Sequence, residues 1–450
     1  MRIRNAIVQS RIESLRKTNG MRNPNTHKNS LFIAAVAIWL AACVSTFVPH
    51  ERVKTPALDS TKFSAIDVAI EAFIVAEKMP GAVFHLERSG QQYVRAYGRY
   101  AYAVEAEIVE TSSIYDIASL TKVVATAPAV MLMIEDGKLE LDAPLSRYFP
   151  NCAGGGKDAI TLRHLLTHTS GLAAGLPSRL ANGDAWQGQQ AAFTLACAQK
   201  VTHPPGTFFR YSDINFILLG LLVQQVGGEP LDTLIARRLF APLQMRDTGF
   251  LPLSRAALSQ SGVAISRIVP TQKSSLAPAS SLHADLHVGQ ELRGIVHDPT
   301  IRFMGGVGGS AGVFSTAADL ARFARMMLNG GELDGVRVLS RESVRLMTSV
   351  QSPATVAVRR SAGWDINSPF SRPRGELFPI GSVGHTGFTG CILWIDPFSK
   401  SFYIFLSNRV YPDDKANILP LYGKLGTLAA EAIADFDFRN LPGTLPKQTP

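Results

Sequence analysis

The 450-residue sequence lacks low-complexity segments, and it shows no internal repeat at the roughly 20 to 50 residue period of solenoids and propellers. Charged residues make up only 18% of the chain, whereas 46% is hydrophobic. This composition excludes an intrinsically disordered or collagen-like protein. What remains is a globular chain that is long enough to bury a large core, as one large domain or as a few smaller ones.

The net charge of +9 is concentrated at the N-terminus. Residues 1–30 hold seven Lys or Arg residues and one acidic residue, which gives +6 and leaves +3 for the rest of the chain. A body so close to neutral lacks the basic surface that binding to a phosphate backbone requires. We therefore expect no nucleic-acid partner.

A secretory signal follows the basic stretch. Residues 31–42 are uncharged and apolar, and extending the run through Val48 brings it near the length of an uncleaved membrane anchor. Residues 40–43, Leu-Ala-Ala-Cys, resemble the lipobox of bacterial lipoproteins, in which the cysteine is acylated. We expect a lipoprotein on the periplasmic side of the cell envelope, held by a lipid on Cys43 or by the uncleaved signal.

The leader affects both the expected start of translation and the expected domain boundaries. Translation from Met21 instead of Met1 would give the basic region a more usual length. The chain is expected to divide into a leader, a polar tether, a folded body and a tail, which span residues 1–43, 44–62, 63–437 and 438–450.

With Cys43 assigned to the lipid, three cysteines remain, so one thiol should stay free in an oxidising compartment. Cys152 and Cys197 lie 45 residues apart and can pair. Cys391 stands in an apolar strand pattern and is expected to be a small buried side chain.

Alternating patterns predict two hairpins, one at each end of the body, with helices between them. The strands are expected at 81–88 with 91–97 and at 391–395 with 402–406, and the helices at 122–135, 163–166, 214–226, 231–239 and 316–328. The last helix begins with a capping-box variant, Thr316 to Asp319. The order predicts an α+β protein in which strands from both termini share one antiparallel sheet, with flanking helices and a mostly helical inserted region.

A nucleophile candidate stands at the start of the 122–135 helix. Ser119 and Lys122 form an S-x-x-K motif, whose spacing puts both side chains on one helix face. The lysine amine can then take the serine proton if its surroundings keep it largely neutral. Two further motifs follow in the chain: Tyr211-Ser-Asp213 before an apolar helix, and His385-Thr386-Gly387-Phe388 beside the C-terminal hairpin.

These three ordered motifs resemble the serine β-lactamase and penicillin-recognising superfamily, in the branch with class C β-lactamases, D-alanyl-D-alanine carboxypeptidases and esterases. The resemblance implies that Ser119 is acylated, that Lys122 accepts its proton, and that Tyr211 protonates the leaving group and activates the deacylating water. The backbone N–H groups of Ser119 and Phe388 would form the oxyanion hole. No metal or cofactor is implied.

Two residues depart from the family pattern. Position 213 is Asp where the family usually has Asn, and its charge should keep Lys122 protonated. His385 replaces the first Lys of the family's K-T-G motif, which weakens the expected grip on a substrate carboxylate. Both changes favour peptidase or esterase activity over efficient β-lactam turnover.

Other nucleophile and ligand patterns give competing readings. Ser310 lies in a G-x-S-x-G sequence with Asp365 and His385 after it, the order of α/β-hydrolases, although no strand-to-helix context is evident. His164 and His168 have the spacing of zinc ligands without the following Glu, so no metal site is expected. His297 and Asp298 either cap a turn or line a pocket.

The sequence therefore predicts an exported serine hydrolase that works through an acyl-enzyme. Its substrate would be a small D-Ala-D-Ala-type peptide, a β-lactam or a carboxylic ester. The alternatives are a catalytically weak envelope protein that binds penicillin or peptidoglycan, and an α/β-hydrolase-type esterase that uses Ser310.

Overall fold

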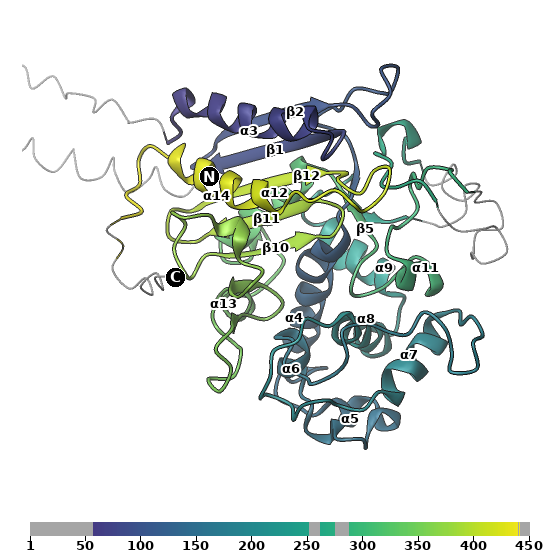
Figure 1. Ribbon diagram of the computed structural model, residues 1–450. Helices are drawn as coiled ribbons and strands as arrows, with labels where there is room; N and C mark the ends of the chain where they lie inside the picture. The colour runs from purple at the N-terminus through teal and green to yellow at the C-terminus, as the bar shows by residue number, and fades with distance from the viewer. Residues whose placement is uncertain (1–56, 252–261, 275–287, 440, 442–450) are drawn as a thin grey trace, which may run out of the picture. The chain divides into compact units, whose positions relative to one another are not determined.

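The computed structural model describes residues 57–251, 262–274, 288–439 and 441 (Figure 1). The expected leader and the acylated Cys43 lie outside the described residues. They stay predictions.

Among the described residues, seven strands form an antiparallel sheet in the order β2-β1-β12-β11-β10-β9-β8. The strands are β1 (Gly81–Arg88), β2 (Gln91–Gly98), β8 (Arg359–Arg360), β9 (Asp365–Asn367), β10 (Val383–Gly387), β11 (Cys391–Asp396) and β12 (Ser401–Ser407). The N-terminal β1 pairs with the C-terminal β12, with Ala82 opposite Ser407. Both predicted hairpins and their shared sheet are confirmed.

Strand side chains alternate between two hydrophobic layers, because successive residues point to opposite faces. Phe84 and Phe405 lie in the layer that contains α3 and α14, whereas Ile404 and Leu406 lie in the larger layer that contains α12. Figure 1 shows α3 and α14 along the sheet. These helices are α3 (Phe63–Val75), α14 (Leu419–Glu431) and α12 (Ala317–Leu328).

The remaining helices and short strands form the inserted region and its connections. The helices and helical turns are η3 (Ala118–Leu120), η4 (Lys122–Thr126), α4 (Ala127–Glu135), α5 (Leu145–Tyr148), η5 (Pro150–Cys152), α6 (Leu162–Leu166), α7 (Gln189–Ala198), α8 (Asp213–Gly227), α9 (Leu231–Ile235), η7 (Ala236–Phe240), α11 (Pro299–Phe303) and α13 (Arg341–Thr348). The short strands are β3 (Tyr115–Asp116), β4 (Gly249–Phe250), β5 (Val313–Ser315), β6 (Glu332–Leu333) and β7 (Val336–Arg337).

All five predicted helices are present within a few residues of the expected bounds. Thr316 is the N-cap of α12, and its hydroxyl accepts the N–H of Asp319 at 3.2 Å, which is one half of the predicted capping box; the Asp319 carboxylate instead accepts the N–H of Asp247 and the hydroxyl of Thr248, both at 2.8 Å. The segment Ala118–Glu135 is apolar enough to span a membrane, but 83% of it is buried in the fold, as in the core helix of a globular domain.

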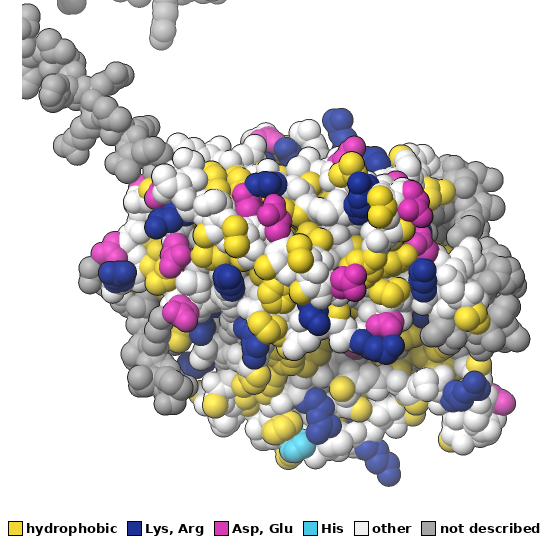
Figure 2. Space-filling model, turned by 45° about the horizontal axis from the view of Figure 1, so that its top comes forward, with side chains coloured by type: hydrophobic (Ala, Val, Ile, Leu, Met, Phe, Trp, Pro, Cys, Tyr) yellow, Lys and Arg dark blue, Asp and Glu magenta, His cyan; other side chains and the backbone are white. Residues whose placement is uncertain are grey.

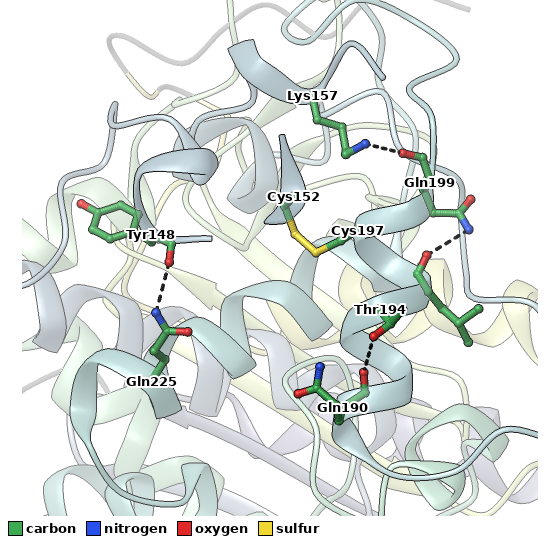
Figure 3. Close-up of a disulfide and its surroundings, with 9 residues drawn as sticks. Tyr148, Cys152, Lys157, Gln190, Thr194, Cys197, Gln199 and Gln225 are labelled. Atoms are coloured by element: carbon green, nitrogen blue, oxygen red, sulfur yellow. Dashed lines mark hydrogen bonds between the residues drawn. A yellow bond between two sulfur atoms is a disulfide. The ribbon is translucent and has the colours of Figure 1, made fainter. Parts of the chain in front are cut away.

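A disulfide joins Cys152, at the end of η5, to Cys197 near the end of α7 (Figure 3). Next to it, Lys157 donates from Nζ to the carbonyl of Gln199 at 2.9 Å. The thiol of Cys391 is free and buried in β11. The pairing and the buried thiol both agree with the sequence prediction.

Basic and acidic side chains are interspersed on the face drawn in Figure 2. On α3 and β2, for example, Arg95 forms ion pairs with Asp67 and Glu71. Charges of both signs therefore compensate each other locally on this part of the molecule.

Candidate active site

Ser119 lies in a tight turn that connects β3 to the buried helix η4–α4. The preceding Ala118 has a φ of 45°, a left-handed conformation that non-glycine residues rarely adopt. Lys122 opens η4, which has π-helical hydrogen bonding, and its Nζ lies 3.1 Å from the Ser119 oxygen. The predicted pair is therefore brought together.

The Lys122 ammonium is fully buried among hydrogen-bond acceptors, one of which is the Tyr211 oxygen. It donates to Ser119, to the carbonyl of Ser310 at 2.8 Å and to the Asp213 carboxylate at 2.7 Å. Burial lowers the pKa of Lys122, but the charges and hydrogen bonds of Asp213 and Tyr211 outweigh burial, so the pKa is raised above its ordinary value. The resting lysine is an ammonium that donates to Ser119, as the departure at position 213 led us to expect.

Tyr211 immediately precedes the N-cap of α8 and packs over this pair. Its ring centre lies 5.0 Å from the Lys122 Nζ. The ring stacks on His168 at 4.5 Å, and the His168 Nδ1 accepts the N–H of Ser212 at 3.0 Å. His168 therefore positions the segment that carries Tyr211, which is a structural role.

The strand β10 supplies the third motif. Burial and the charges of Arg360 and Lys122 hold the pKa of His385 well below its usual range, so the imidazole is neutral. Its Nδ1 donates to the carbonyl of Thr386 at 2.8 Å. A Cβ on Gly387 would lie 2.4 Å from the carbonyl of Ile117, so only glycine lets β10 approach the nucleophile turn this closely.

The three motifs meet at one cavity of about 160 Å³. The volume is equivalent to about five water molecules in the liquid. Its lining residues are Ser119, Tyr211, Arg360, Asp365, Phe370, His385, Thr386 and Phe388. All three predicted motifs thus contribute to a single site.

Two lining residues had no signal in the sequence. Arg360 is 1% exposed in β8, and its Nη1 lies 3.4 Å from Asp365 in β9. Phe370, on the loop after β9, is 5.4 Å from the Tyr211 ring. Both reach the site because β8 and β9 add to the sheet beyond β10, an order that no local motif encodes.

Ser310 does not have the geometry of a nucleophile elbow. It is 1% exposed in a loop that follows Met304, with neither a strand directly before it nor a helix directly after it. Its carbonyl holds Lys122, and its buried hydroxyl has no hydrogen-bond partner within the described ranges. The all-antiparallel main sheet also differs from the parallel sheets of α/β proteins, so the Ser310 alternative is wrong.

The remaining histidine candidates have structural partners. His164 caps α6 together with Thr161. Asp298 is the N-cap of α11, and the ring of His297 stacks on Phe388 at 5.5 Å. The His297–Asp298 segment therefore caps a helix and packs on the back of Phe388, and neither residue is among those that line the cavity.

The sequence from residue 66 to 426 matches the family model described as β-lactamase. The chain belongs to the β-lactamase family of serine hydrolases. Two Escherichia coli proteins named "Putative D-alanyl-D-alanine carboxypeptidase", from strains O157:H7 and K12, are each 32% identical over 313 residues, which cover 66% of this chain and 70% of the relative.

The fold of this chain is similar to solved structures of a penicillin-binding protein homolog and a class C β-lactamase. A penicillin-binding protein homolog from Caulobacter crescentus has a TM-score of 0.63 at 19% identity, covering 84% of this chain and 99% of the homolog. A class C β-lactamase has a TM-score of 0.62 at 18% identity, covering 86% of this chain and 100% of the lactamase. The predicted superfamily and the α+β fold are confirmed.

Proposed function

We propose that this member of the β-lactamase family is an exported hydrolase that cleaves a D-alanyl-D-alanine-type peptide through an acyl-enzyme on Ser119. The observation that carries the proposal is the buried Lys122 ammonium, which lies 3.1 Å from the Ser119 oxygen and beneath the Tyr211 ring, behind the cavity that Ser119 and Tyr211 line. The carboxypeptidase name of the 32% identical relatives supports the peptide substrate. A β-lactam or a simple carboxylic ester would enter the same first step.

In the proposed acylation step, Ser119 attacks the substrate carbonyl and its proton passes to Lys122. Because Lys122 is already an ammonium, it can accept this proton only as it transfers one of its own to Asp213, 2.7 Å away. The new C–O bond pushes negative charge onto the carbonyl oxygen. The N–H groups of Ser119 and Phe388 would stabilise that charge.

Collapse of the tetrahedral intermediate breaks the scissile bond, and the leaving group needs a proton. Tyr211 would deliver it, and the position of its ring in the cavity lining beside Lys122 supports this role. In deacylation the resulting Tyr211 phenolate would take a proton from the attacking water, and Ser119 would regain a proton from Lys122 as Asp213 returns its proton to the lysine. The neutral His385 shapes the cavity without adding a cation.

The proposed location is the cell envelope, with the chain anchored through Cys43 or an uncleaved signal. The disulfide between Cys152 and Cys197 supports an oxidising compartment, since such bonds are rare in the cytosol. The proposed peptide substrate is found outside the cytoplasmic membrane, where an exported enzyme would meet it.

The test is intact-protein mass after incubation with a β-lactam, together with hydrolysis of a chromogenic ester. We expect a covalent adduct and ester hydrolysis by the native chain, and a loss of at least about 1,000-fold in hydrolysis for Ser119→Ala. Ser310→Ala is the matched control and should keep both signals. Activity that survives Ser119→Ala would refute the proposal.

A slow penicillin-binding protein is the second candidate. The ion pair between Lys122 and Asp213 favours slow chemistry at Ser119, because an ammonium is a poor base for this hydroxyl. The same mass measurement separates the candidates: a persistent adduct indicates slow deacylation, whereas an adduct that decays within minutes indicates turnover.

A further inference from the structure

Asp116 is a buried carboxylate three residues before Ser119, at the end of β3. Its Oδ1 accepts the N–H of Ala118 at 2.9 Å, and its Oδ2 accepts the N–H of His297 at 2.7 Å. Backbone N–H groups bound to an ionised oxygen form strong, directional hydrogen bonds. One side chain thus ties the nucleophile turn to the loop before α11.

The first tie holds a strained turn. Ala118, with its φ of 45°, precedes Ser119, and surrounding contacts must offset the strain of an alanine in this left-handed conformation. The hydrogen bond from Ala118 to Asp116 is such a contact. It fixes the peptide plane next to the Ser119 N–H, which is one donor of the proposed oxyanion hole.

The second hydrogen bond, from the N–H of His297 to Asp116, connects Asp116 to the segment of Phe388. The His297 ring stacks on Phe388, whose N–H is the second oxyanion donor. The main-chain carbonyl of Asp116 also accepts the hydroxyl of Thr389, which follows Phe388, at 2.7 Å. Asp116 therefore contacts both segments that would carry the oxyanion hole.

We propose that Asp116 is a positioning residue that aligns the two oxyanion donors, and that it does so fully only while its carboxyl is ionised. This inference rests on the proposed function. The charged and titratable groups that face Asp116 are Asp298 and Arg302 on α11, the thiol of Cys391 on β11, and His297. Burial raises the pKa of Asp116 to about 6, in spite of the two N–H bonds and Arg302.

Protonation then has opposite effects on activity and stability. A protonated carboxyl has one hydroxyl donor in place of an acceptor, so one of the two N–H groups loses its partner. Activity should fall below pH 6. The native pKa of about 6 lies above the unfolded value of about 3.9, so this group stabilises the fold as the pH falls from 6 to 4.

The experiment measures kcat and KM for a chromogenic ester from pH 5 to 8, together with melting temperatures. The native chain should lose roughly tenfold in kcat through an apparent pKa near 6, at nearly constant KM. Asp116→Asn cannot ionise, so its kcat should be low and flat across this range, and Asp116→Glu should restore part of the pH dependence. Raising the pH from 5 to 8 should lower the melting temperature of the native chain relative to that of Asp116→Asn.

Asp396→Asn is the matched control. Asp396 is also a buried carboxyl whose pKa burial raises, but it holds the turn at the opposite end of β11 through the N–H groups of Phe398 and Ser399. Its variant should keep the native kcat and pH profile.

A native kcat that stays flat from pH 5 to 8, or an Asp116→Asn variant with the native profile, would overturn the inference. If Asp116→Asn does not fold, the pH dependence of kcat and of the melting temperature of the native chain tests the inference without the variant. If Ser119→Ala loses ester hydrolysis but the native kcat does not change with pH, the proposed role of Asp116 is refuted. The proposed function is then still supported. Hydrolysis that survives Ser119→Ala removes the function itself.

Discussion

Lys122 is a buried cation whose closest charged neighbour is a carboxylate, at a position where the family usually has an amide. The Nζ to Oδ1 distance of 2.7 Å makes Asp213 the strongest influence that keeps the lysine charged. A charged lysine stabilises the fold through the ion pair, but it must release a proton before it can activate Ser119. Stability and reactivity therefore oppose each other at this residue.

Asp213→Asn should make Lys122 more reactive and the fold less stable. Without the carboxylate, burial dominates and the pKa of Lys122 falls, so more of the lysine is neutral near pH 7. We expect faster acylation by a β-lactam at neutral pH, by roughly tenfold, and a lower melting temperature because a buried cation loses its partner. The measurement is the acylation rate as a function of pH, and Asp232→Asn on α9 is the control. A pH profile that does not shift in Asp213→Asn would contradict the proposed proton transfer between Lys122 and Asp213.

At the scale of elements, the approach of β10 to the turn before Ser119 sets the width of the site. Gly387→Ala would place a methyl group 2.4 Å from the Ile117 carbonyl, so the strand must move outward. We expect kcat for ester hydrolysis to fall by roughly 100-fold, since misplacement by about 1 Å has that effect. Gly249→Ala in β4, where a Cβ meets nothing within 4 Å, should keep the native rate. Equal rates for the two variants would show that the approach is not needed.

The elements that patterns could predict are those with strong local signals. The two hairpins, α4, α8 and α12 follow from alternation, helical periodicity and the Thr316 cap. Six α-helices of the described residues, α3, α5, α7, α11, α13 and α14, were not predicted. The apolar residues of α3 and α14 pack against each other and against the sheet. These segments are far apart in the sequence, so no local pattern indicates the contact.

The same distinction applies to the site. Ser119, Lys122, Tyr211 and His385 each stand in a short motif, so the sequence identified them. Asp116, Arg360 and Phe370 were not identified as site residues, because their roles come from turns and strand pairings that join distant segments. Such long-range contacts depend on the fold as a whole.

At the scale of the whole molecule, the disulfide closes a loop of 45 residues between η5 and α7. Closing such a loop restricts the unfolded chain and contributes about 4 kcal/mol to the free energy of unfolding in the chain-entropy model. The double variant Cys152→Ser, Cys197→Ser should show this loss in urea unfolding. Reduction of the native chain should give the same loss, and an unchanged midpoint in both would contradict the expected stabilisation.

The pairing of β1 with β12 has a consequence for biogenesis. Ser119 emerges in the first third of synthesis, but its facing strand β10 and the partner strand of β1 come from residues 383–407. The nascent polypeptide cannot assemble a working catalytic centre until nearly all of it is available. The proposed export of the chain in an extended state would thus keep Ser119 unreactive until folding is complete on the far side of the membrane.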